Sequence, residues 1–374
     1  MKHVVRVLGL LASWGTLAAA QSMGVGGSGT TWAVAPALES YRFRAADRVG
    51  IQGISLLSVP MAGRVTLHPR FSAELSGAWA SGTVSEPGGR SRTLSGLTDA
   101  TVQLQGTLVE DRVSLVLVAA APTGVATHDS AQAVVAGVMA ADLLPFRVMT
   151  WGAGGGLGAQ LLVTQRMGRT GIGFSTGVRR AGDFEPVAAD PFVYRPGLET
   201  SARVAVDHDL MGGGKLSFTA GVQAFGDDQV DGRNLFRSGA RVTAIGTLGV
   251  PMAGGGSAAL YGGVLHRSNG SFLDATQPAS PAQDLLLAGG VLRRPVGRGI
   301  VSPRADMRLF RSADGVGQGY LASVGLGYER RGQTTVLSPV LTARIGQVTV
   351  REGAQSGLIG LDLGLSVRFL KGGR

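Results

Sequence analysis

Apolar and polar residues alternate one by one over long stretches of this chain. Every second residue is apolar from Lys215 to Phe225, and the same pattern runs through residues 357–370. A period of two over ten or more residues predicts a β-strand whose two faces meet different environments. Strands of soluble proteins usually have about five or six residues, whereas tilted strands that cross a membrane need about 9 to 11. The pattern therefore predicts membrane-crossing strands, and it recurs at 99–108, 170–179, 199–210 and 237–248.

Short and long connections alternate between these stretches, as in bacterial outer-membrane barrels with tight periplasmic turns and longer outer loops. Short links fall at 110–111, 166–168, 211–214, 251–255, 295–299 and 331–332. Long links fall at 81–96, 122–147, 181–197, 226–235, 268–282, 312–317 and 348–356. Seven long and six short links join 14 strands, so the spacing predicts a barrel within residues 67–374.

Residues 21–66 allow two interpretations. They can supply a further hairpin, from 31–43 and 51–67, which makes 16 strands, or they can fold into the lumen as a plug. The spacing narrowly favours 14 regular strands. The fold class expected is thus all-β, a transmembrane antiparallel β-barrel. The soluble alternatives are a two-sheet sandwich, which usually has shorter strands, and a solenoid, which needs a fixed repeat that this chain lacks.

The first 20 residues predict a cleaved secretory signal peptide. Lys2, His3 and Arg6 precede a short apolar run, and three alanines place cleavage after Ala20. No later window reaches the roughly 18 apolar residues of a membrane helix. The predicted location is the outer membrane of a Gram-negative cell.

Composition excludes several classes of protein. Glycine contributes 60 of the 374 residues, charged residues only 16%, and cysteine is absent. Without cysteine, disulfide scaffolds, thiolate metal sites and thiol nucleophiles are excluded. A mean hydropathy of +0.20 is too high for a disordered chain.

One segment has a familiar pattern. Gly96-Leu97-Thr98-Asp99 begins a strand, Glu110-Asp111 forms a turn, and the returning strand reaches Pro122-Thr123-Gly124. This pattern resembles outer-membrane barrels of the phenol-degradation (MetA-pathway) type, which look like distant relatives of the long-chain fatty-acid transporter barrel. The resemblance implies passage of small, often hydrophobic molecules, and it implies no catalytic residues.

The chain offers little for catalysis, and we expect no enzyme, cofactor or metal. In Asp207-His208-Asp209 a histidine is flanked by two acids, and alternation directs His208 away from both carboxylates. His128 lies beside Asp129 and Ser130 in a long loop, where Ser130 is expected to cap a helix. A nucleic-acid partner is not expected, despite a pI near 10.8, because the arginines are dispersed and stacking aromatic residues are few.

Charged residues on the polar phase of the strands are the candidate pore lining. They are Arg64, Glu74, Asp99, Arg203, Arg237, Arg241, Arg304, Asp306, Arg308, Arg344 and Arg368. They can form a solvated wall of paired charges, or a lining whose positive excess favours anions.

Residues 131–144 break the alternation and are rich in helix formers, which predicts a short apolar helix in a long loop. Glycines at 152–158 and 171–177 follow on one face of two strands. We expect the helix to fold into the lumen against this glycine-rich wall, because glycine leaves room for a close approach.

The function expected is passive passage of small solutes, hydrophobic or anionic, across the outer membrane. The alternatives are a structural or adhesive barrel without an open pore and, less favoured, an outer-membrane protease or lipase. The expected partners are outer-membrane lipid and lipopolysaccharide, the barrel-assembly machinery and the solute. The identity of the solute and the oligomeric state stay open at this stage.

Overall fold

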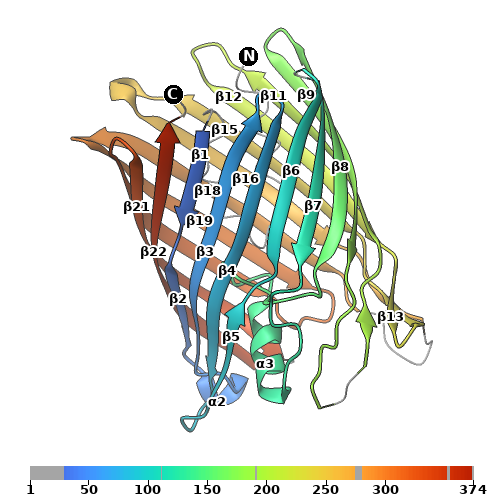
Figure 1. Ribbon diagram of the computed structural model, residues 1–374. Coiled ribbons are helices and arrows are strands. Elements are labelled where there is room, and N and C mark those ends of the chain that lie inside the picture. The colour runs from blue at the N-terminus through green and yellow to red at the C-terminus, as the bar shows by residue number, and fades with distance from the viewer. Residues whose placement is uncertain (1–28, 111, 190–191, 274–279, 352–353, 373–374) are drawn as a thin grey trace.

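The computed structural model describes residues 29–110, 112–189, 192–273, 280–351 and 354–372, so the predicted signal peptide lies outside the described residues. The described chain forms an all-β, 16-stranded antiparallel barrel (Figure 1). The barrel is closed because β22 (Ala354–Gly372) pairs with β1 (Gly29–Val34) and β2 (Ala37–Phe43) as well as with β21 (Thr335–Arg351).

The remaining wall segments follow in chain order, and each pairs with its sequence neighbours. They are β3 (Gly53–His68), β4 (Phe71–Ser85), β5 (Ser91–Leu97), β6 (Ala100–Val109), β7 (Val113–Ala121), β8 (Gly156–Met167), β9 (Thr170–Ala181), β11 (Glu199–Asp209), β12 (Lys215–Phe225), β15 (Arg241–Pro251), β16 (Ser257–Arg267), β18 (Gln283–Val296), β19 (Gly299–Ser312) and β20 (Gly319–Arg331). Two strands of the wall are each made of two segments. β1 and β2 form one of them, because both pair with β22 and β3, and β5 and β6 form the other, because both pair with β4.

The N-terminal hairpin is part of the wall. β1, β2 and β3 pair along their length, so the strand count is 16 and the preference for 14 is corrected. The predicted long link at 81–96 is also corrected, because β4 and β5 pair from Ser85↔Ser91 onward and leave only a tight turn. In β3 apolar residues occupy the inner as well as the outer phase, as at Leu56 and Leu57, which conceals the alternation. In β4 and β5 the outward residues next to the turn are serine and threonine, so this part of the wall has the polarity of a loop.

The two ends of the barrel differ. The described chain starts and finishes at the end with the short turns, which include the 3-10 helix η2 (Ala253–Gly255) (Figure 1). The opposite end carries α2 (Ala46–Val49), α3 (Ser130–Met139) and a small separate sheet formed by β10 (Tyr194–Arg195), β13 (Asp227–Val230), β14 (Arg233–Arg237) and β17 (Ser271–Phe272). We call these the short-turn end and the long-loop end.

The outer surface is a continuous apolar belt. Outward residues of successive strands are exposed leucines and valines, such as Val324 at 63% and Leu363 at 45%. An exposed apolar surface that surrounds the whole wall is the signature of a barrel in contact with lipid. None of the described helices is long and apolar enough to cross a membrane.

Aromatic residues mark the short-turn boundary of this belt. Trp32, Phe71, Tyr328 and Phe369 are exposed on the outer face near that end. Three of these rings lie over glycines of a neighbouring strand: Trp32 over Gly63, Phe71 over Gly106 and Tyr328 over Gly299. A flanking band of aromatic residues is typical of the membrane interface of such barrels.

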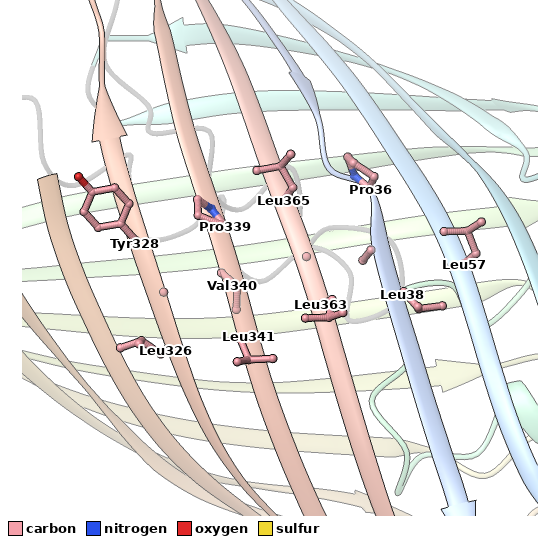
Figure 2. A pocket seen from close by; sticks show the side chains of 13 residues that line it. Pro36, Leu38, Leu57, Leu326, Tyr328, Pro339, Val340, Leu341, Leu363 and Leu365 are labelled. Atoms are coloured by element: carbon pink, nitrogen blue, oxygen red, sulfur yellow. The ribbon is translucent and has the colours of Figure 1, made fainter.

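An apolar groove lies on the outer face where β1 gives way to β2. Pro36 breaks the strand because it has no N–H to donate. Figure 2 shows Leu38, Leu57 and Leu363 beside Pro36 along this groove. The wall stays closed at the break, because the Ala35 N–H donates to the Pro60 carbonyl and the Leu365 N–H to the Pro36 carbonyl, both at 2.9 Å.

The predicted loop helix forms, and it lies against the inner wall. Asp129 is its N-cap, with a reciprocal bond to Gln132, so the expected cap at Ser130 is corrected to the preceding residue. We call residues 130–151, which comprise α3 and the segment after it, the plug segment. Its buried side chains, among them Val135, Met139, Phe146 and Trp151, join one apolar cluster with inward residues of β2 to β5 and β18 to β22.

The wall beneath the plug segment is not the expected one. α3 contacts β4 and β5, and Trp151 donates a hydrogen bond from Nε1 to the Ala80 carbonyl of β4 at 3.1 Å. Gly82 provides room there, since a Cβ at that position would meet Met139 and Trp151. The glycines of β9 do face inward, but the plug segment packs on the other side because that side carries the apolar inward residues.

Candidate functional site in the lumen

A network of charged groups fastens the plug segment to the barrel wall. The Arg147 N–H donates to Glu39 Oε2 at 2.9 Å, and Arg147 Nη2 lies 3.4 Å from Asp362 Oδ1. On the wall itself, Arg344 Nη2 donates to Asp362 Oδ2 at 3.1 Å. Glu39 and Asp362 are 1% and 3% exposed, so these carboxylates depend on the arginines for their hydrogen bonds.

The register of the strands explains why these groups meet. Glu39 is opposite Asp362 on β2 and β22, and Asp362 is opposite Thr342 on β21. One residue pair further along, Tyr41 is opposite Gly360, which is opposite Arg344. Gly360 is required there, because a Cβ would lie 2.7 Å from the Tyr41 ring. The large inward side chains of β2 and β21 are thus packed on either side of Gly360.

The same rows continue onto β19 and β20. Arg304 Nη2 donates to Thr342 Oγ1 at 2.6 Å, across Gly325 of β20. Asp306 accepts a bond from Ser323 Oγ at 2.7 Å. Arg308 lies one step closer to the long-loop end, opposite Leu321. This half of the lumen therefore combines buried apolar residues at the long-loop end with a belt of paired charges.

The wall formed by β9, β11 and β12 is different. Its inward residues are mostly small or uncharged: Gly171, Gly173, Ser175, Gly177, Ser201, Ala205, Ser217, Thr219 and Gly221. Longer side chains lie over them, as Gln160 donates to Ser175 Oγ at 3.1 Å and Arg203 crosses Gly221. Within the described residues, none of the members of the apolar cluster around the plug segment belongs to β8, β9, β11, β12 or β15.

The structure divides the sequence-predicted lining residues into groups. Arg304, Asp306, Arg308 and Arg344 come together beside the plug segment. Arg64 and Glu74 face each other across β3 and β4, and Arg368 pairs with Glu329, all toward the short-turn end. Arg203 and Arg241 lie on the small-residue side, where Arg241 stacks on Phe225 at 5.5 Å.

Two predicted lining residues have other positions. Arg237 lies in β14 of the small outer sheet and pairs with Asp227 at 2.6 Å, which raises the pKa of the guanidinium. Asp99 lies at the break between β5 and β6. Its Oδ1 accepts from the Gly124 N–H at 3.0 Å and its Oδ2 from the Ala153 N–H at 2.9 Å. Asp99 therefore holds both ends of the loop that contains the plug segment.

Two residues of the network were not anticipated as lining. Glu39 lies in the N-terminal segment, where apolar residues occur on both faces of the strand, so the sequence does not reveal which face points into the lumen. Arg147 belongs to a loop, so strand alternation says nothing about it. For Glu39, the order Ala37, Glu39, Tyr41, Phe43 along a broken strand was the available signal.

The acid–histidine clusters do not form a catalytic arrangement. His208 Nδ1 lies 2.9 Å from Thr170 Oγ1, while Asp207 pairs with Lys215 and Asp209 with Arg166. His266 and Asp284 pair at 2.7 Å on the outer face. Across the described parts of the chain, no group of three or more potential ligand side chains is arranged to hold a metal ion.

Comparisons with known proteins give fold likeness only. No family model and no curated protein sequence matches the chain. Among solved structures, OprB of Pseudomonas putida is similar at 9% identity and a TM-score of 0.49, over 91% of this chain and 94% of that one. An outer membrane channel from Pseudomonas putida F1 is similar at 14% identity and a TM-score of 0.37, over 92% and 97%.

A third similar structure is an anion-selective porin from Comamonas acidovorans, at 12% identity and a TM-score of 0.42, over 91% of this chain and 98% of that one. The second is described as an outer membrane channel and the third as a porin. At these identities and scores the likeness does not bear on function, which has to be argued from the residues of this chain.

Proposed function

We propose that this protein is an outer-membrane channel for passive passage of small solutes. The observation that carries the proposal is the asymmetric lumen. The plug segment occupies one side, and the opposite side is lined by small polar residues outside the plug's apolar cluster. A barrel whose only task was structural would have no need for inward residues kept small along three adjacent strands.

The solute path runs along β9, β11 and β12, past Arg203 and Arg241, toward the short-turn end. The arginines on the lumen wall outnumber the carboxylates, which favours anions among charged solutes. The short turns face the periplasm and the long loops face the outside, following the general asymmetry of such barrels.

The test is conductance of the purified protein in a planar lipid bilayer. Discrete current steps are expected, and a silent membrane would contradict a channel. Replacing Arg241, Arg304 and Arg308 together by glutamine should shift the reversal potential toward weaker anion preference. Single changes are expected to do less, because the remaining arginines keep the lumen wall positive. An unchanged reversal potential in the triple variant would show that these arginines do not set selectivity.

A further inference from the structure

We infer that the lumen holds a binding site for a single carboxylate attached to an apolar body, formed by Arg344, Arg308 and the Tyr41 hydroxyl beneath the plug segment. This inference rests on the proposed channel function and names the substrate class that the channel would select. Three separate features lead to it: unpaired polar atoms, the balance of charge and the apolar surroundings.

Arg344 is only partly used by its neighbours. It is 8% exposed, and one of its nitrogens, Nη2, donates to Asp362. Its Nε and Nη1 are buried and have no hydrogen-bond partner among the described residues, although Nη1 lies 4.0 Å from Glu39 Oε1. A buried guanidinium with free donors incurs a desolvation cost that an additional oxyanion would offset.

The Tyr41 hydroxyl is a second donor at the same place. Tyr41 is fully buried, its ring lies 5.7 Å from the guanidinium carbon of Arg344, and its hydroxyl has no hydrogen-bond partner within the described chain. Buried tyrosine hydroxyls usually find a partner. Arg308 is near enough to interact electrostatically with both Tyr41 and Arg344, and it is partly exposed to the lumen. Arg308 is therefore the member of the site that an anion in the lumen would meet first.

The charges at this place do not cancel. Four arginines (Arg147, Arg304, Arg308 and Arg344) stand against three carboxylates (Glu39, Asp306 and Asp362), which leaves 4 − 3 = +1. A further negative charge would offset this excess, and the two oxygens of a carboxylate suit the planar fork of a guanidinium.

The surroundings are apolar on the long-loop side of these donors. Leu321, opposite Arg308, is fully buried, and Leu358, Phe310 and Phe146 belong to the same apolar cluster. The Phe146 ring packs edge-on against Tyr41 at 5.3 Å, so an aromatic or aliphatic body would continue an existing apolar surface. The expected ligand is thus an amphipathic acid, with its carboxylate on the arginines and its body toward the plug segment.

Benzoate is a suitable probe, and titration calorimetry on the purified protein in detergent measures its binding without reference to transport. Arg308→Gln should weaken benzoate binding by about tenfold or more, as expected for loss of a charge-assisted hydrogen bond. Tyr41→Phe should weaken it severalfold, and it should fold normally because the hydroxyl it removes has no partner. Arg293→Gln, whose arginine pairs with Glu329 near the short-turn end, is the matched control and should bind benzoate like the original protein.

Two other probes separate the charge from the body. Benzyl alcohol lacks the charge and acetate lacks the ring, and both should bind far more weakly than benzoate. Equal affinity of the original protein and both site variants for benzoate would overturn the site, as would tight binding of benzyl alcohol. Those results, together with current steps in the bilayer, would overturn the site and leave the channel function standing. Absence of current steps in the original protein, together with benzoate binding, would contradict the channel function and leave the site standing.

Discussion

The two halves of the lumen are built from the same type of strand, yet their inner faces have opposite characters. β2 to β5 and β18 to β22 carry buried leucines, phenylalanines and an arginine–carboxylate network, and they hold the plug segment. The middle parts of β9, β11 and β12 present mostly glycine, serine, threonine and alanine, and their inward charged residues, among them Arg203 and Asp207, lie between or beyond these. Burial differs less than residue type, since Ser58 on the first side and Ser175 on the second are both buried, while Ser201 on the second is half-buried.

In the proposed channel, this difference would let one barrel be both stable and permeable. A lumen filled evenly would be closed, and an empty one would pass anything that fits. By placing the large apolar residues on one side only, the chain keeps an ordered plug, and the other side is the proposed path of the solute. The charged network fixes the position of the plug segment because an unpaired buried charge is costly.

Removing the plug segment should have the largest effect on the difference between the two halves of the lumen, and the effect is measured as single-channel conductance. Replacing residues 130–151 by a short Gly/Ser link should raise single-channel conductance severalfold, because the filled half of the lumen becomes open. Replacing residues 227–237 of the outer sheet by the same link is the control and should leave the conductance nearly unchanged. If both deletions had the same effect, the plug segment would not be what limits the bore.

Breaking the charged network should destabilise the filled half. Asp362→Asn leaves Arg344 and Arg147 without their shared carboxylate, which should lower the free energy of unfolding by about 3–5 kcal/mol. Asp284→Asn removes a half-exposed carboxylate on a barrel strand and should cost at most about 1 kcal/mol. Equilibrium unfolding by urea in lipid vesicles measures both, and similar losses would mean that burial of the network adds nothing.

Narrowing the small-residue wall should reduce current without moving the plug segment. Ser201→Trp places a large ring in the lumen, whereas Thr200→Trp places it on the outer face one residue away. The inner variant should conduct less than the original protein and the outer variant should conduct equally. A drop in both would indicate that a tryptophan disturbs the strand on either face.

The smallest expected effect is a loosening of the plug loop at low pH. Burial lowers the pKa of His128, which precedes α3 and whose Nδ1 is buried without a partner among the described residues. The folded loop therefore favours the neutral ring, so its stability is full above the unfolded pKa near 6.5 and falls as the pH drops below that value. Protease cleavage within residues 122–155 should increase at pH 5 in the original protein and not in His128→Gln. Equal pH dependence in both would exclude this histidine.

Much of this architecture could be predicted from the sequence, and the errors have physical causes. Alternation locates the strands where one face meets lipid and the other is polar, as at 215–225, and it fails where both faces are apolar, as in β3. The inward apolar residues of β2 and β3, which conceal the alternation of these strands, are also the ones that pack against the plug segment. The alternation pattern therefore predicts the wrong wall for the plug segment. The separation between Glu39, Arg147 and Asp362 along the chain conceals their network, because only closure of the barrel brings them together.

The chain contains no cysteine among its described residues or elsewhere in its sequence, so a thiol can be introduced at one chosen place. The central claim is that solute passes along the small-residue wall and not past the plug segment. Thr243 lies on the inner face of β15 beside Gly221, and Ser58 lies on the side of the lumen that holds the plug segment. Each is replaced by cysteine in a separate variant, Thr243→Cys and Ser58→Cys. A charged, membrane-impermeant thiol reagent should reduce the current through Thr243→Cys and leave Ser58→Cys unaffected. Modification of Ser58→Cys with no effect on Thr243→Cys would contradict the account.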